Sequence, residues 1–111
     1  MSTADQLRLA RISGIASRHT AAAALTEEQR AQALADLRQV ADGRVDILAE
    51  HAGTVLGASE NGHPFIVQQA ELIAELCLQA GADADAIERW RKVGRQRSAD
   101  ARRIPYTGAR Q

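Results

Sequence analysis

The chain has 111 residues, of which 45% are hydrophobic, and its 14 basic side chains equal its 14 acidic ones in number. This length fits one domain that needs no metal to fold, and the single cysteine excludes an internal disulfide. The longest uninterrupted apolar run, residues 21–25, is too short to span a bilayer, and no segment has the form of a signal peptide. The sequence therefore predicts a cytoplasmic protein, with a thin core because 23 of its 50 hydrophobic residues are Ala.

The zero net charge hides a strong segregation of charge along the chain. Residues 1–25 sum to +2, residues 26–60 to −4 and residues 61–88 to −5, whereas residues 89–111 carry eight basic side chains and one acidic. The C-terminal stretch is therefore a basic segment attached to an acidic body. A segment of this kind usually meets an anionic partner.

The spacing of apolar residues predicts an all-α protein with five helices, because no segment shows the period-two alternation of a strand. The first helix is expected over residues 3–19, opening with a capping-box spacing at Thr3 and Gln6. The second is expected to begin after Thr26, where acidic residues in the first turn suit the helix dipole, and to end before Gly43.

The third helix is expected over residues 44–58. In it Gly53 and Gly57 lie four apart, on a stripe that would let another backbone come close. The fourth is expected to begin at Pro64 and to stop at Gly81. It carries the broadest apolar face of the chain, which predicts that it is the central helix.

The fifth helix is expected to begin at a cap provided by Asp83 or Asp85 and to run to about Arg103. The proline and glycine that follow it predict a short, frayed end of the chain. The expected architecture is a compact all-α bundle of about five short helices in a single domain, residues 1–103, with a flexible C-terminal tail, residues 104–111.

The fifth helix is amphipathic when its side chains are placed at 100° per residue. Its apolar arc contains Trp90, which would anchor the helix, and also Arg97, which is unusual at such a position. Cations on its other side could each meet a phosphate and release condensed counterions, giving sequence-independent affinity that falls steeply with salt. These candidate nucleic-acid-binding or partner-binding residues are Arg89, Arg91, Lys92, Arg95, Arg102 and Arg103.

The leading hypothesis is a small non-enzymatic protein, nucleic-acid-binding or regulatory, that contacts phosphates through this basic helix. The alternative is an interaction adaptor or homo-oligomeric component, such as a homodimer, in which the helix and tail dock on an acidic protein. A purely structural role also fits, with the arginines paired to acidic residues of the second to fourth helices. Glu71 and Glu75 of the fourth helix are the candidates for such pairing.

The sequence predicts no catalytic, cofactor-binding or metal-binding residue. His19, His51, His63 and Cys77 show none of the two-, three- or four-residue spacings that place two metal ligands on one helical face. No serine lies in a nucleophile-elbow sequence, and no glycine loop has the form of a phosphate-binding loop. We therefore expect neither a cofactor nor an enzymatic activity.

Residues 48–53, Leu-Ala-Glu-His-Ala-Gly, resemble the first helix and turn of repressor-type helix-turn-helix domains, and residues 60–62 resemble the close of the recognition helix. The interval between the two pieces is about four residues shorter than that family needs. If the resemblance held, it would imply base or phosphate contacts from Thr54 and Ser59. A glycine-containing core helix is the simpler interpretation of the same residues.

Overall fold

The computed structural model describes residues 3–20 and 25–103, apart from the side chains of Arg102 and Arg103. Within these ranges the fold is an all-α bundle without strands, as predicted. Its helices are α1 (Thr3–His19), α2 (Glu27–Ala41), α3 (Val45–Ser59), α4 (Pro64–Gln79) and α5 (Ala84–Arg103). The predicted tail, residues 104–111, lies outside the described residues. None of the described helices combines the length and apolar character that crossing a membrane demands.

Local side-chain contacts explain why helices begin where they do. The Thr26 hydroxyl accepts a hydrogen bond from the Gln29 N–H at 3.1 Å, and the Gln29 side chain accepts one from the Thr26 N–H at 2.9 Å. This reciprocal capping box satisfies two donors that the first turn of α2 would otherwise leave unpaired. Of the two candidate caps for α5, Asp83 takes the role instead of Asp85, since its carboxylate accepts from the Ala86 N–H at 2.9 Å.

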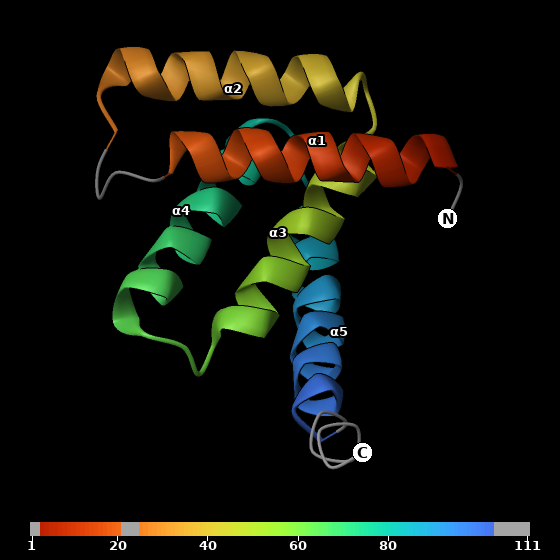
Figure 1. Ribbon diagram of the computed structural model, residues 1–111. Coiled ribbons are helices and arrows are strands. Elements are labelled where there is room, and N and C mark those ends of the chain that lie inside the picture. The colour runs from red at the N-terminus through yellow and green to blue at the C-terminus, as the bar shows by residue number, and fades with distance from the viewer. Residues whose placement is uncertain (1–2, 21–24, 104–111) are drawn as a thin grey trace.

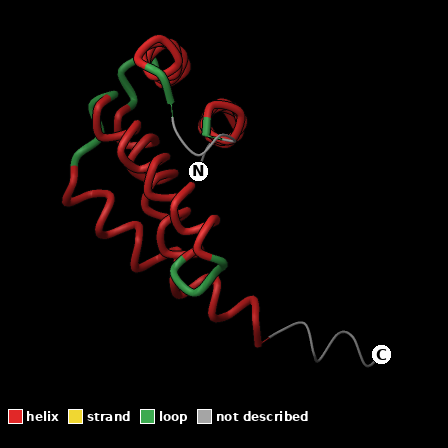
Figure 2. The backbone as a smooth tube through the Cα atoms, turned by 90° about the vertical axis from the view of Figure 1, so that its left-hand side faces the viewer, coloured by secondary structure: helices red, strands yellow, loops and turns green. Residues whose placement is uncertain are grey.

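α1 and α2 form an antiparallel hairpin that lies across one end of the other three helices (Figure 1). Figure 2 shows the two helices of this hairpin end-on, beside the ends of the others. α3 contacts all four other helices and is the centre of the fold. The prediction that α4 is central is therefore wrong. The broad apolar face of α4 is not fully covered, because Phe65 and Ile66 in its first turn are each 46% exposed.

The core contains a few large aliphatic side chains separated by alanines. Burial raises the pKa of the Cys77 thiol within this core to about 12, so the thiol stays protonated and unreactive. α5 contributes Ile87 to the same cluster, with Trp90 packed against it. The fully buried leucine and isoleucine residues, one from each of the first four helices, are Ile12, Leu37, Leu48 and Leu76.

Glycines bring α3 and α5 together, as the spacing of Gly53 and Gly57 predicted. A Cβ atom added at Gly57 would lie 2.5 Å from the backbone nitrogen of Arg95. From the other helix, a Cβ atom added at Gly94 would lie 2.7 Å from the Cα atom of Thr54. Real Cβ atoms do not approach backbone this closely, so the two helices pack at a distance that only glycine permits.

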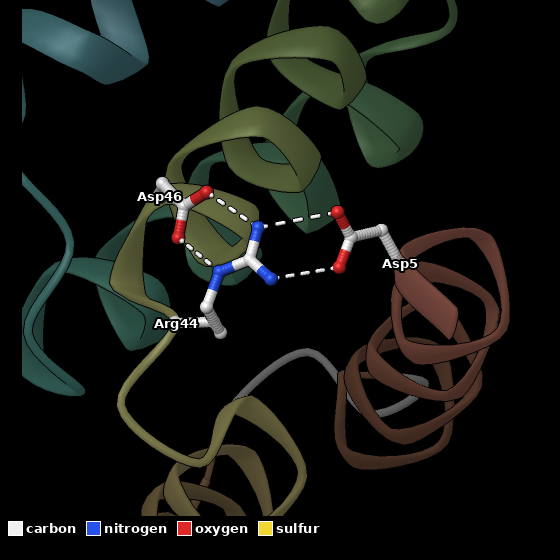
Figure 3. Close-up of polar contacts among 3 residues, drawn as sticks. All are labelled: Asp5, Arg44 and Asp46. Carbon is white, nitrogen blue, oxygen red and sulfur yellow. Dashed lines mark hydrogen bonds and ion pairs between the residues drawn. The ribbon is translucent and has the colours of Figure 1, made fainter. Parts of the chain in front are cut away.

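Arg44, the residue before α3, ties α1 to the rest of the fold. Its guanidinium donates to the two carboxylate oxygens of Asp46 at 3.0 Å each, and to those of Asp5 in α1 at 2.7 and 3.3 Å (Figure 3). These hydrogen bonds, first those to Asp46 and then those to Asp5, raise the pKa of Arg44, and the bonds from Arg44 in turn lower the pKa of Asp46. Because both edges of the guanidinium are engaged, the contact is structural.

Candidate nucleic-acid interface

α5 carries its predicted cations on one side, part of which lies beside α3, since the backbone of Arg91 and Arg95 meets Gly57. Its other side is held by Ile87, which is buried, by Gly94 against Thr54, and by Trp90, which is partly buried against the core. Trp90 therefore lies where an anchor for this helix is expected. The last turns of α5 extend beyond the end of α3 (Figure 1).

Two of the six predicted cations are already paired inside the protein. The Glu60 carboxylate, just after α3, accepts hydrogen bonds from Arg91 Nε at 2.7 Å and from Arg95 Nε and Nη2 at 2.6 and 2.7 Å. The Glu60 side chain is 19% exposed, and hydrogen bonds from Arg95 and then Arg91 lower its pKa to about 2. These charge-assisted bonds occupy one edge of the Arg95 guanidinium and the Nε–H of Arg91, so a phosphate would have to compete with Glu60 for these donors.

The acidic partner differs from the residues that the sequence suggested. Glu75 of α4 instead pairs with Arg30 of α2 at 3.0 Å, and Glu71 makes no ion pair with any residue in the described ranges. A sequence signal for Glu60 did exist. It follows Gly57 by three residues, so it lies on the side of α3 where the glycine stripe admits another helix.

Two other cations of the basic side are open to solvent. Arg89 and Lys92 are exposed, lie three residues apart on one face of α5, and make no ion pair or hydrogen bond within the described part of the chain. Arg97, expected in the apolar arc, is exposed, and its guanidinium carbon lies 5.9 Å from the centre of the Trp90 ring. This cation–π contact explains how the charged Arg97 can lie on the same arc of α5 as Trp90. The side chains of Arg102 and Arg103 lie outside the described part.

A groove of about 650 Å³ lies between α4 and α5, with α3 beneath it. Arg91 and Arg95 line its α5 side, while Glu71 and Glu75 line its α4 side. The two paired arginines therefore face a groove that also carries carboxylates, whereas Arg89 and Lys92 face away from Glu60. The apolar lining of the groove is formed by Leu56, Val67, Ala70, Ala74 and Leu78.

Two further titratable groups are buried next to each other in α3, apart from the groove. Glu50 and His51 of α3 are both buried, and burial raises the pKa of Glu50 and lowers that of His51 to about 4. The Nε2 atom of His51 finds no hydrogen-bond partner. His19, at the end of α1, bonds the Asp36 carboxylate of α2 at 2.9 Å. Within residues 3–20 and 25–103, no three His, Cys, Asp or Glu side chains gather as metal ligands would.

The helix-turn-helix resemblance does not extend to the structure, because α3 continues without a turn from Val45 to Ser59. The Thr54 hydroxyl donates to the Glu50 carbonyl oxygen at 2.8 Å, a bond within the helix. No protein-family model matches the sequence, and no curated protein or solved structure shows significant similarity to it.

Proposed function

We propose that this chain is a small non-enzymatic, cytoplasmic accessory protein that contacts nucleic-acid phosphates through the outer face of α5. The observation that carries the proposal is the exposure of Arg89 and Lys92, which have no acidic partner in the described ranges. Arg91 and Arg95 lie on the adjoining, groove side of α5, with side chains 39% and 51% exposed, and a phosphate would compete with Glu60 for them. We include Arg102 and Arg103 in the proposed contact set from the sequence.

The expected binding is electrostatic and insensitive to sequence. Contacts from Lys and Arg to phosphates fix the position of a protein on a nucleic acid but do not read bases. Each neutralised phosphate contributes about −0.9 to the slope of log K against log salt, so Arg89 and Lys92 together should contribute about −1.8.

The test is a salt titration of binding to random duplex and single-stranded oligonucleotides, from about 50 to 200 mM salt, with binding measured by fluorescence anisotropy. It uses the full chain, since removing α5 would uncover the glycine stripe of α3. The variant Arg89→Gln/Lys92→Gln should make the slope of log K against log salt less negative by about 1.8. The control Arg11→Gln removes an exposed cation of α1 that makes no ion pair in the described ranges. Equal slopes for the variant and the unmodified chain, or no binding at low salt, would refute the proposal.

The second candidate function is a protein-interaction adaptor. It is favoured by the groove between α4 and α5, which combines an apolar lining with carboxylates and guanidinium groups. Protein-binding sites commonly have such an apolar centre with a polar rim. If oligonucleotides do not bind, this candidate takes precedence.

A further inference from the structure

The groove between α4 and α5 has the shape of a site for another helix. α4 and α5 both pack on α3, and the space between them is lined along α4 by Val67, Glu71, Ala74 and Leu78. These residues are spaced four, three and four apart, which is the spacing of a seam between two helices. The seam covers 11 residue steps, or about 16 Å at 1.5 Å per residue, which corresponds to three helical turns.

The lining of the groove supplies apolar area that this chain does not cover. Leu78, at one end of the seam, is 43% exposed. Ala70 and Ala74 at its floor are already buried, so the open apolar area comes from Leu78 together with the partly buried Val67 and Leu56. An amphipathic helix with apolar residues at every third or fourth position is the ligand that such grooves accept.

The charges that line the groove determine which sign of charge the docked helix should carry along its polar edge. Arg91 and Arg95 on the α5 side share Glu60, and Arg91 also lies 3.9 Å from the carboxylate of Glu88, so two carboxylates balance the two guanidinium groups. Glu75 is paired with Arg30. Glu71 is exposed and makes no ion pair or hydrogen bond in the described ranges, and α4 contains no Lys or Arg. The charge left open in the groove is therefore negative, on the α4 side.

We propose that this groove docks an amphipathic helix of another protein, with Lys or Arg residues along the edge that faces Glu71. The same charges disfavour the other occupants. A nucleic acid would bring phosphates against Glu71 and Glu75, and a second copy packed through its own α4 would bring four carboxylates together.

The probe is a synthetic, fluorescein-labelled helical peptide of about 16 residues, with Leu and Ala at every third or fourth position and Arg along one edge. A matched peptide carries Glu in place of each Arg. Binding to the full chain is measured by anisotropy, and the contacted residues are located from amide chemical shifts. We expect the Arg-edged peptide to bind at least about tenfold more tightly than the Glu-edged one, with shifts along α4 and α5.

Two substitutions in the groove locate the site, each with a matched control elsewhere. Glu71→Gln should weaken the Arg-edged peptide by about threefold, since a solvent-exposed ion pair contributes little, while Leu78→Ser should weaken it by about five- to tenfold. The controls are Glu28→Gln on α2 and Leu7→Ser on α1, where Leu7 is 63% exposed. Both should bind as the unmodified chain does.

Three results would overturn the proposal: equal affinity for the two peptides, unchanged binding by both groove variants, or a dimer in sedimentation whose groove amides are protected without peptide. Thermal melts establish that each variant is folded. The groove variants leave Arg89 and Lys92 in place, so the oligonucleotide titration separates failure of this proposal from failure of the nucleic-acid proposal.

Discussion

Replacing Gly57 by Ala tests the close packing of α3 and α5 most directly. The added Cβ atom would lie 2.5 Å from the backbone nitrogen of Arg95 and would also meet the carbonyl oxygen of Arg91. Carbon atoms in favourable contact lie about 3.5 Å or more from their neighbours, so α5 would have to retreat by about 1 Å. The obstruction is helix backbone, which no change of rotamer can relieve.

The expected cost follows from two opposing effects. Overpacking a well-filled interface costs about 3 kcal/mol in a case where the backbone must move. Replacing Gly by Ala inside a helix stabilises the folded state by about 1 kcal/mol, because Gly has the greater conformational freedom in the unfolded chain. The net loss is about 2 kcal/mol. For 111 residues at about 2.1 cal/mol/K of unfolding entropy per residue, the thermal midpoint should fall by about 9 °C.

Gly14 of α1 provides the matched control, since a Cβ atom added there meets nothing within 4 Å. Gly14→Ala should therefore show the helix-propensity gain alone, about 0.5–1 kcal/mol, and raise the midpoint by about 2–4 °C. Both variants are compared with the unmodified chain by circular dichroism during heating and by urea unfolding. A Gly57→Ala variant as stable as Gly14→Ala would refute the packing argument.

Three further predictions concern single side chains. Glu60→Gln should tighten oligonucleotide binding by releasing Arg91 and Arg95. The variant should be less stable than the unmodified chain, and this difference in the free energy of unfolding should be greatest above pH 4.5 and vanish toward pH 2, because the folded pKa of Glu60 lies below the unfolded one. Thermal melts at several pH values measure it. His51 has a folded pKa near 4, below its ordinary 6.5, so stability should fall by up to about 3 kcal/mol as the pH falls from 6.5 to 4. His51→Leu should abolish that dependence in urea unfolding at pH 7, 5.5 and 4, and an unchanged slope would contradict it. Leu37→Ala, at a fully buried site, should cost about 2–5 kcal/mol in urea unfolding, and a loss below 1 kcal/mol would contradict its place in the core.

The helices of this protein could be predicted because the signals for their ends are local. The capping box at Thr26 and the proline at the start of α4 act over three or four residues, so the sequence shows them directly. The glycine spacing in α3 also predicted a close helix contact. Local signals do not identify the helix that packs against α3. Gly57 indicates that another backbone comes close, and only the fold shows that this backbone belongs to α5.

The candidate site was less predictable, since its electrostatics arise between residues far apart in the sequence. Glu60 and Arg91 are separated by 31 positions, and Arg30 and Glu75 by 45. Hydropathy was also misleading about the centre of the fold. It favoured α4 for its large apolar residues, whereas α3 holds the central position because its alanines and glycines let other helices approach it from several sides.

The glycine contact between α3 and α5 also explains how the charges of the protein are distributed. Because Gly57 admits the backbone of α5, Glu60, three residues further on, lies within hydrogen-bond distance of both Arg91 and Arg95. α4 packs on another part of α3, so its Glu71 stays apart from these arginines and remains open in the groove. One packing arrangement therefore has two effects on the surface. It pairs Arg91 and Arg95 with Glu60, while Arg89 and Lys92 stay exposed without an ion pair in the described ranges. It also leaves the neighbouring groove with an acidic edge, so phosphates and a cationic helix would bind on different sides of α5.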